Sequence, residues 1–287
     1  MDKSLYNKVM NVIKSYHGLS KDCLTLCKTT FPSISPDALS SIISNEYQKR
    51  MKYNYIKTSD TINGYYNLYQ DRLNHCDPPG IIVQLSRESG ICPCLVAKLI
   101  LQKFYGEDSS TPDSVGKLSS IVQTYMRDTN LIPDPRLAYE TYLCTIYDDL
   151  YSPLVEIMKA SLGQEYEIKL YRELLSLGLA FRDEEHLRTY GYDKTPDFKL
   201  EIPVAVNGFI INWVESKALF ANEEVHEEYF RHQYGSYCNR FGPGLVIYWF
   251  GFVESVVQSS DHQGLLIKDH FPSDVVHILP PKSLRDN

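Results

Sequence analysis

The sequence predicts a chain in two parts: an all-α region with helix-turn-helix elements over residues 1–160, and an α/β domain with a mixed central sheet over residues 161–287. Three observations predict this fold class. Up to about residue 160 the pattern is helical, and no strand-like alternation appears. After Gly163 an amphipathic helix is followed by short β-rich runs. Asn207-Gly208 lies between two of these runs and is a strong hairpin signal.

The N-terminal region divides into short helices separated by breaker segments. The clearest breaks are 77–80, 106–116 and 130–135, which are rich in Pro, Gly and Asp. The expected helices are Leu5–Tyr16, Ser20–Thr29, Asp37–Lys52, Thr61–Asn74, Ile81–Arg87, Pro93–Tyr105, Val115–Arg127, Pro135–Leu150 and Ser152–Ser161. No repeat of fixed period is found.

Residues 81–104 have the pattern of a helix-turn-helix. Ser86 is small where the two helices would cross, and Gly90 lies in the turn. Val96 and Leu99 fall at core positions of the second helix. The exposed positions of that helix carry lysine and glutamine, whereas a recognition helix usually offers arginine, asparagine or glutamine to base edges. Packing against protein therefore stays open as an alternative to reading DNA.

The C-terminal domain begins with an amphipathic helix over residues 165–178. Strands are expected at 197–206 and 208–220, joined by the hairpin turn, and a charged helix is expected at Asn222–Asn239. The apolar run 245–253 is typical of a buried strand. Two late short strands are expected at 265–271 and 275–279.

Composition indicates an ordinary globular protein without a membrane span. No apolar run approaches 18 residues, and the first residues lack the apolar core of a signal peptide. We therefore expect the protein in the nucleus and cytoplasm, where its seven cysteines would be reduced thiols. A zinc site from His75, Cys76, Cys92 and Cys94 is disfavoured, because the Cys-x-Cys spacing is tight and the neighbouring residues are apolar.

Charge is distributed unevenly along the chain. Residues 1–160 contain 17 basic and 17 acidic side chains, whereas residues 161–287 contain 12 basic and 19 acidic ones. The best candidate for nucleic-acid contact is therefore in the N-terminal region, where Lys49, Arg50 and Lys52 alternate with tyrosines. An ordinary solvated helix end explains these three residues equally well.

Acidic and basic residues recur at strand positions around the predicted hairpin. Glu215 and Lys217 are two apart, so they share one face of a strand, and the turn folds them back toward Asp197. The arm from Asp197 to the turn is longer than the returning arm, so the register requires a bulge or a slanted start. Two carboxylates close together favour a cation, and hard oxygen ligands suit Mg²⁺ or Mn²⁺. Lys217 would orient or deprotonate the attacking water, or stabilise charge on the phosphate.

Pro196-Asp197 followed by Glu215-Ser216-Lys217 resembles the signature of PD-(D/E)XK nucleases. The resemblance implies a restriction-endonuclease-like fold in which a metal ion is bound by Asp197, Glu215, Ser216 and a glutamate from the preceding helix. That helix is similar to the first helix of archaeal Holliday-junction resolvases, and Glu167 is the matching glutamate.

Gln233 and Tyr237 resemble the Gln-x-x-x-Tyr element of RecB-type nucleases. They are four residues apart, so on a helix they share one face, from which they would contact the phosphate backbone of a substrate.

The whole chain resembles the family of codanin-interacting nucleases. The matching stretches are 192–198, 203–206, 215–218 and 239–249. The resemblance implies a nuclease that acts on DNA, the scaffold protein codanin as partner, and a role in chromatin-related processes and erythropoiesis. The acidic C-terminal half departs from the resolvase pattern and argues against strong, general DNA affinity.

The charged residues of the hairpin also allow a non-catalytic interpretation. They could form a surface salt-bridge cluster, or the domain could be an inactive nuclease fold that serves as a protein-interaction platform. Glu167 would also suit the first turn of a helix, where it complements the helix dipole. His226 is expected to be solvated among glutamates, and a second Thr-Pro-Asp at Thr111-Pro112-Asp113 is interpreted as a turn.

Overall fold

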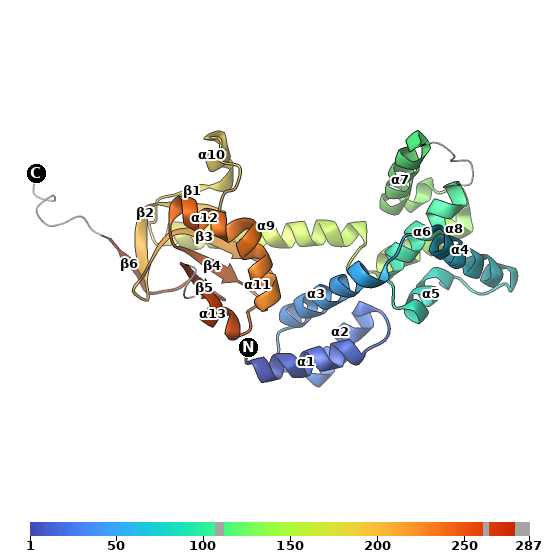
Figure 1. Ribbon diagram of the computed structural model, residues 1–287, viewed down its shortest axis with the longest axis horizontal. Helices are drawn as coiled ribbons and strands as arrows, with labels where there is room; N and C mark the ends of the chain where they lie inside the picture. Colours follow the sequence, from blue (N-terminus) through green and yellow to red (C-terminus); the bar gives the residue numbers. More distant parts are fainter. Residues whose placement is uncertain (107–111, 261–263, 279–287) are drawn as a thin grey trace, which may run out of the picture. The chain divides into compact units, whose positions relative to one another are not determined.

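The computed structural model describes residues 1–106, 112–260 and 264–278. The chain forms two compact units: residues Val9–Lys159 make one, and Met1–Lys8 with Ala160–Asn287 make the other. We call them the helical unit and the sheet unit, and Figure 1 shows the elements of each. Among the described residues, every helix is too short or too polar to cross a lipid bilayer.

The helical unit is built from helices close to those expected from the sequence. Their bounds are α1 (Lys3–Ser15), α2 (Ser20–Thr30), α3 (Pro36–Asn54), α4 (Ser59–Asn74), α5 (Ile81–Ser89), α6 (Pro93–Gly106), α7 (Pro112–Arg127), the short η1 (Thr129–Leu131) and α8 (Pro135–Tyr147). The predicted helix Pro135–Leu150 ends early because Asp148 accepts backbone N–H bonds from Leu150 and Tyr151, which turns the chain.

Helix α6 is the centre of the helical unit. It contacts α4, α5, α7 and α8, and Figure 1 shows these helices grouped around it. Ser86 in α5, and Val96 and Leu99 in α6, are fully buried, as the helix-turn-helix pattern predicts. Because neighbours cover α6 on several sides, it is not presented to solvent as a recognition helix in a DNA groove would be.

Buried carboxylates close the ends of these central helices. Gly80 offers no side chain to cap α5, and the Glu140 carboxylate accepts the N–H groups of Gly80 and Ile82 instead. Asp148 accepts the N–H of Cys94 at 2.8 Å at the start of α6. These acids are buried because they satisfy orphan helix donors, so they have a structural role.

Helix α9 runs without interruption from Pro153 to Ser176. The sequence predicts two helices here, one ending at Ser161 and another beginning near residue 165, and this prediction was wrong. Gly163 is tolerated inside the helix, where a glycine costs only about 1 kcal/mol relative to alanine. Glu167 is therefore in the middle of α9 and not in a first turn, so the helix-dipole explanation for it fails.

The sheet unit contains a mixed six-stranded sheet. The bounds are β1 (Phe181–Asp183), β2 (Phe198–Val206), β3 (Phe209–Lys217), β4 (Gly244–Tyr248), β5 (Leu265–Lys268) and β6 (Val275–His277). The order is β1-β2-β3-β4-β5, and β6 pairs with the end of β2. β1 pairs antiparallel with β2 and β2 pairs antiparallel with β3, whereas β3, β4 and β5 run parallel to one another. The sequence did not predict β1, the short helix α10 (Glu184–Thr189) or α13 (Ser255–Ser260).

The hairpin of β2 and β3 forms as the sequence predicts. Asn207 and Gly208 both have positive φ, at 50° and 78°, as a two-residue hairpin turn requires. The pairing register shifts between Lys199 and Val204, which is the expected bulge. Beyond it Phe198 pairs with Val214, so Asp197 and Glu215 are brought to the same level of the sheet.

The core of the sheet unit lies between the sheet and α9. Leu170 and Leu174 of α9 pack against Phe198, Val214 and Ile247. On another part of the sheet, Trp213 is fully buried and its ring lies against Gly244; a Cβ on that glycine would be 2.1 Å from the ring. Only glycine fits at the start of β4.

The segment after β3 is one helical stretch with a change of pitch. It consists of α11 (Glu223–Tyr229), a π-helical turn (Phe230–Tyr234) and α12 (Gly235–Phe241). The predicted helix Asn222–Asn239 is therefore correct in extent but not in regularity. π-Turns add a residue to the helix and frequently occur at functional sites.

The first residues of the chain belong to the sheet unit. The Met1 ammonium donates to the Phe252 carbonyl at 2.7 Å, and Lys3 pairs with Glu223 at 2.7 Å. The Tyr6 hydroxyl accepts from the Asn222 amide, also at 2.7 Å. No sequence signal indicates these contacts, because they join residues more than 200 positions apart.

Candidate active site

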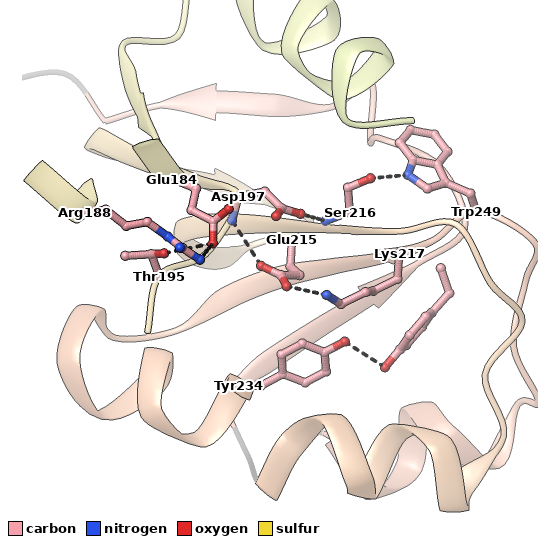
Figure 2. A network of polar contacts seen from close by, with 10 residues as sticks. Glu184, Arg188, Thr195, Asp197, Glu215, Ser216, Lys217, Tyr234 and Trp249 are labelled. Atoms are coloured by element: carbon pink, nitrogen blue, oxygen red, sulfur yellow. Dashed lines mark hydrogen bonds and ion pairs between the residues drawn. The ribbon is translucent and has the colours of Figure 1, made fainter. Parts of the chain in front are cut away.

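Asp197 and Glu215 are joined by a reciprocal pair of hydrogen bonds. The backbone N–H of Asp197 donates to Glu215 Oε2 at 3.1 Å, and the backbone N–H of Ser216 donates to Asp197 Oδ2 at 2.7 Å (Figure 2). Each carboxylate is therefore held by the backbone of the other strand, which fixes both side chains relative to the sheet. Ser216 also accepts a bond from the Trp249 indole at 2.8 Å through Oγ, so its side chain is occupied.

Lys217 completes the cluster. Its Nζ is 2.7 Å from Glu215 Oε1, and the exposed fractions of the two side chains are 16% and 2%. The ammonium also lies 5.0 Å from the centre of the Tyr229 ring in α11, a cation–π distance. Asp197, Glu215 and Lys217 thus form a partly buried group at the ends of adjacent strands, and an exposed salt-bridge cluster does not describe them.

Burial controls the titration of these groups. It raises the pKa of Asp197 to about 8, and the neighbouring Glu215 adds to the effect. Burial also raises the pKa of Glu215, although Lys217 opposes the rise. For Lys217 burial acts to lower the pKa, but Glu215 and Asp197 outweigh it and raise the pKa to about 12. Lys217 is therefore cationic in the metal-free site, which suits charge stabilisation.

Two further glutamates, Glu167 and Glu184, interact electrostatically with this cluster. Burial raises the pKa of Glu167, and Asp197 and Glu184 raise it further, while Lys217 lowers it. The predicted Glu167 is therefore sensitive to the charge of Asp197. Sequence reasoning missed Glu184, whose charge raises the pKa of both Asp197 and Glu215. The signal was weak, because Glu184 is one of two adjacent acids at the start of a short helix that was not predicted.

Glu184 is anchored beside the cluster, as Figure 2 shows. Its Oε1 accepts from Arg188 Nη2 at 2.7 Å and from Thr195 Oγ1 at 3.3 Å. Thr195 is buried and lies two residues before Asp197, so it links α10 to the start of β2. Arg188 is thereby held on the solvent side of the candidate site, with its side chain 63% exposed.

Gln233 and Tyr237 lie on the helical stretch that follows β3. Tyr237 is buried; burial raises its pKa, and the charges of Glu215 and Asp197 raise it further. The Oε1 atom of Gln233 is buried and has no hydrogen-bond partner among the residues that the structure describes. Gln233 is in the π-turn and Tyr237 in α12, so the regular four-residue spacing assumed for one helical face does not hold.

A buried polar chain lies behind Lys217. Tyr248, which is opposite Lys217 on β4, shares a 3.3 Å hydroxyl contact with Tyr234 and a 2.9 Å contact with His226 Nδ1. All three side chains are buried. The expectation of a solvated His226 was wrong, because His226 is on the inner face of α11, turned away from the surrounding glutamates.

The three basic residues of α3 do not form a uniform patch. Lys49 and Lys52 are exposed. Arg50 is half-buried and donates to the backbone carbonyls of Ile13 and Tyr16, near the end of α1, and pairs with Glu46 at 3.2 Å. Arg50 is therefore a cap for α1 carbonyls, a structural role that its place among lysines did not reveal.

Five of the seven cysteines are buried in the core, whereas Cys76 is exposed and Cys238 is half-buried. Burial raises the pKa of Cys92 and Cys94, and Cys144 beside them is also buried, so all three are neutral thiols. Within residues 1–106, 112–260 and 264–278, no group of three or more His, Cys, Asp or Glu side chains is arranged to hold a metal ion. Of the second Thr-Pro-Asp, Pro112 and Asp113 begin α7 and Thr111 is outside the described residues.

The fold and site define an α/β protein with a half-buried carboxylate, Asp197, and a buried carboxylate, Glu215, beside a lysine on neighbouring strands. Residues 133–271 match a family described as "Protein of unknown function TPD sequence-motif", a range that includes Thr195-Pro196-Asp197. No solved structure matches the chain significantly.

Curated relatives extend over nearly the whole chain. CDAN1-interacting nuclease 1 of Homo sapiens is 41% identical over 278 residues, covering 96% of this chain and 97% of the relative. The Xenopus laevis protein of the same name is 40% identical, covering 96% and 90%. The Danio rerio protein is 39% identical over 258 residues, covering 89% and 84%. The chain therefore belongs to the CDAN1-interacting nuclease 1 family.

Proposed function

We propose that the chain is a Mg²⁺- or Mn²⁺-dependent nuclease of the PD-(D/E)XK type that hydrolyses phosphodiester bonds in DNA. The observation that carries this proposal is the pairing of Asp197 with Glu215, and the contact of Glu215 with Lys217, where the start of β2 lies beside the end of β3. Two like charges held together below the surface destabilise a fold, so a functional reason for them is expected.

The topology supports the superfamily assignment. A helix, α9, is followed by the antiparallel strands β1, β2 and β3, then a helical crossover to β4, which runs parallel to β3. We infer a restriction-endonuclease-like core, in which the acidic residues come from the second and third strands. Asp197 at the start of β2 and Glu215 near the end of β3 occupy those places.

The chemistry of the donor set fits a hard divalent cation. Asp197 and Glu215 are two carboxyl groups beside one lysine, and burial, which disfavours the charged form, raises the pKa of both carboxyls. Mg²⁺ is commonly bound through one or two carboxylates, with water and substrate phosphate as its other ligands, so three converging acidic side chains are not required. Asp197 and Glu215 would hold the ion, with Glu167 and the Ser216 backbone as the remaining candidates.

The residues of the chain would divide the remaining work. A bound Mg²⁺ or Mn²⁺ supplies Lewis acidity toward the phosphate and lowers the pKa of water. Lys217, cationic at all physiological pH values, stabilises negative charge that develops on the phosphate. Tyr237, whose pKa the charges of both carboxylates affect, and the Gln233 Oε1 atom, which has no hydrogen-bond partner in the described part of the chain, would orient the substrate.

The relatives are named for an interaction with CDAN1, and we propose that this chain likewise binds codanin. The helical unit is the candidate for this contact, because its surface exposes Tyr139 and Tyr142, with rings stacked at 6.3 Å. Exposed aromatic pairs are common anchors of protein interfaces.

The test is cleavage of branched, flapped and linear DNA by the purified chain with Mg²⁺, Mn²⁺ or a chelator. We expect cleavage only with metal, and its loss in Asp197→Asn and Lys217→Ala. Asp193→Asn is the matched control, because Asp193 is exposed and pairs with Arg240 outside the cluster. Activity that persists in folded Asp197→Asn and Lys217→Ala, or that is indifferent to chelation, would refute the assignment.

A second candidate is a nuclease fold used as a protein-interaction platform. It is favoured by the excess of acidic residues after residue 160, which opposes strong DNA affinity. Metal titration separates the two, since a platform has no need of a metal that binds to Asp197 and Glu215. Metal binding that Asp197→Asn abolishes supports the enzyme, and an equal response of parent and variant supports the platform.

A further inference from the structure

An exposed strip of aromatic and guanidinium groups lies beside the candidate active site. Tyr190 and Tyr192 follow α10 and are 61% and 37% exposed. The Arg182 guanidinium is 5.2 Å from the centre of the Tyr190 ring, and that of Arg240 is 5.3 Å from the Tyr192 ring. The Tyr192 ring also packs against Phe241, with ring centres 5.5 Å apart, whereas most of Tyr190 is exposed, so burial of apolar surface explains little of the Tyr190 position.

The strip leads directly to the carboxylates. Tyr192 is five residues from Asp197 in the chain, so their Cα atoms are within about 18 Å of each other. Arg188, two residues before Tyr190, is tied through Glu184 to Thr195, at the edge of the cluster in Figure 2. A span of at most about 18 Å corresponds to at most about five nucleotides of one strand at a rise of about 3.4 Å.

The cations of the strip are available to a ligand. Arg182, Arg188 and Arg240 pair with Glu201, Glu184 and Asp193, respectively. Each of these carboxylates is substantially exposed, at 34%, 46% and 77%. Exposed ion pairs are weak, and a guanidinium has five N–H donors, so each arginine keeps donors for a phosphate oxygen.

Stacking rings interleaved with phosphate donors are the requirements of a single-stranded nucleic acid. Unpaired bases offer a free π-face to tyrosine, whereas the bases of a duplex are stacked on each other. We propose that Tyr190 and Tyr192, with Arg182, Arg188 and Arg240, bind an unpaired strand and direct it to the carboxylates. The proposal rests on the proposed nuclease function, because it takes the carboxylates to be the catalytic site, and it names the substrate as a strand with unpaired bases.

The strip also has a composition found at protein interfaces, which are enriched in tyrosine and arginine. Its connection to the candidate site through Arg188, Glu184 and Thr195 favours nucleic acid. A protein partner predicts that changes to the strip leave binding of single strands unaltered, so measuring that binding separates the two.

The test is fluorescence anisotropy with a labelled 20-nucleotide oligo-dT and a 20-base-pair duplex, in chelator so that no strand is cleaved. We expect the full chain to prefer oligo-dT. Tyr190→Ala/Tyr192→Ala should bind it about 25-fold more weakly, at about fivefold for each lost ring. Tyr190→Phe/Tyr192→Phe keeps both rings and should bind like the parent. Arg188→Gln should reduce the slope of affinity against salt by about one phosphate contact.

The matched control is Tyr139→Ala/Tyr142→Ala, which removes an equally exposed tyrosine pair from the helical unit. It should leave oligo-dT binding unchanged. The inference is overturned if the parent binds duplex as tightly as oligo-dT, if it binds neither, or if Tyr190→Ala/Tyr192→Ala binds like the parent while its melting temperature is unchanged. If Tyr190→Ala/Tyr192→Ala has a lower melting temperature than the parent, Arg188→Gln decides instead, and an unchanged slope of affinity against salt in Arg188→Gln would also overturn the inference. If binding behaves as expected but no DNA is cleaved with metal, the nuclease proposal fails and the strand-binding surface stands.

Discussion

Replacing Asp197 by asparagine should stabilise the metal-free protein at neutral pH. Asparagine keeps an oxygen that can accept the N–H of Ser216, which Asp197 accepts at 2.7 Å, but removes a carboxyl group that must either take up a proton or carry an unfavourable charge beside Glu215. A site maintained for function commonly reduces stability, so removal of the functional charge should increase it. A surface salt-bridge cluster predicts the opposite, because Lys217 would lose a nearby negative charge.

The magnitude follows from the titration of Asp197. Its pKa is about 8 in the folded protein, against an ordinary value of 3.8. Between these values the unfolded chain has released the proton and the folded chain retains it, so stability falls as pH rises from about 4 to about 8. The interval from about pH 3.8 to about pH 7, at about 1.36 kcal/mol per pH unit, corresponds to a limit of about 4 kcal/mol. Because Asp197 is half-buried, solvent screening reduces this, and we expect about 1 to 2 kcal/mol.

Tryptophan fluorescence reports the unfolding of the sheet unit, which contains Asp197. Trp213 and Trp249 are the two tryptophans of the sequence, and both are in the sheet unit. Thermal melts in chelator at pH 5, 7 and 8.5 should show a stability gap between Asp197→Asn and the parent that grows with pH and levels off near pH 8. Mn²⁺ at about 100 times its dissociation constant should then stabilise the parent by about 2.7 kcal/mol and leave the variant nearly unmoved.

Asp193→Asn is the control for a charge removed without burial. Asp193 is exposed, and the Arg240 guanidinium beside it lowers its pKa, so its loss should give no gain in stability at any of these pH values. The reasoning is refuted if metal-free Asp197→Asn melts below the parent at pH 7, or if the gap between them does not widen with pH. A parent whose melting ignores Mn²⁺ would end the metal-site assignment as well.

Two further pairs of substitutions test glycine packing and helix capping. Gly244→Ala places a Cβ 2.1 Å from the Trp213 ring, so it should destabilise the sheet unit by about 3 kcal/mol. Gly163→Ala, with open space around it in α9, should stabilise the protein by about 0.5 to 1 kcal/mol. Denaturant unfolding followed by tryptophan fluorescence or circular dichroism measures both changes. Arg50→Ala removes the donor to the backbone carbonyls of Ile13 and Tyr16 and should lower the free energy of unfolding by about 1 to 3 kcal/mol. The control Lys52→Ala should change it by less than about 0.5 kcal/mol. Equal melting of the two variants, followed by circular dichroism, would contradict the capping role of Arg50.

Local signals in the sequence determined most of the secondary structure. The helices of the first half, the hairpin and the bulge follow from periodicity, breakers and the Asn207-Gly208 turn, which depend on neighbouring residues only. The failures have tertiary causes. Gly163 continues a helix although its local propensity is poor, and β1 forms because β2 offers it an edge to pair with.

The central residues of the candidate site could also be predicted from the sequence, because their relative placement depends on strand periodicity and a local turn. Glu215 and Lys217 share a face because strand geometry has a period of two, and the turn brings Asp197 back to them. Only the tertiary structure decided what surrounds them. Glu184 acts on Asp197 through space, and the acceptors of Arg50 are backbone carbonyls more than 30 residues away.

The sequence by itself therefore determined the class of each half, the hairpin and the identity of the three central charges. The tertiary structure alone decided that His226 is buried, that α6 is enclosed by other helices, and that the first eight residues join the sheet unit. The physical reason is the range of the forces involved. Backbone periodicity and turn preference act over a few residues, whereas burial, electrostatic coupling and capping depend on which distant segments the completed fold brings together.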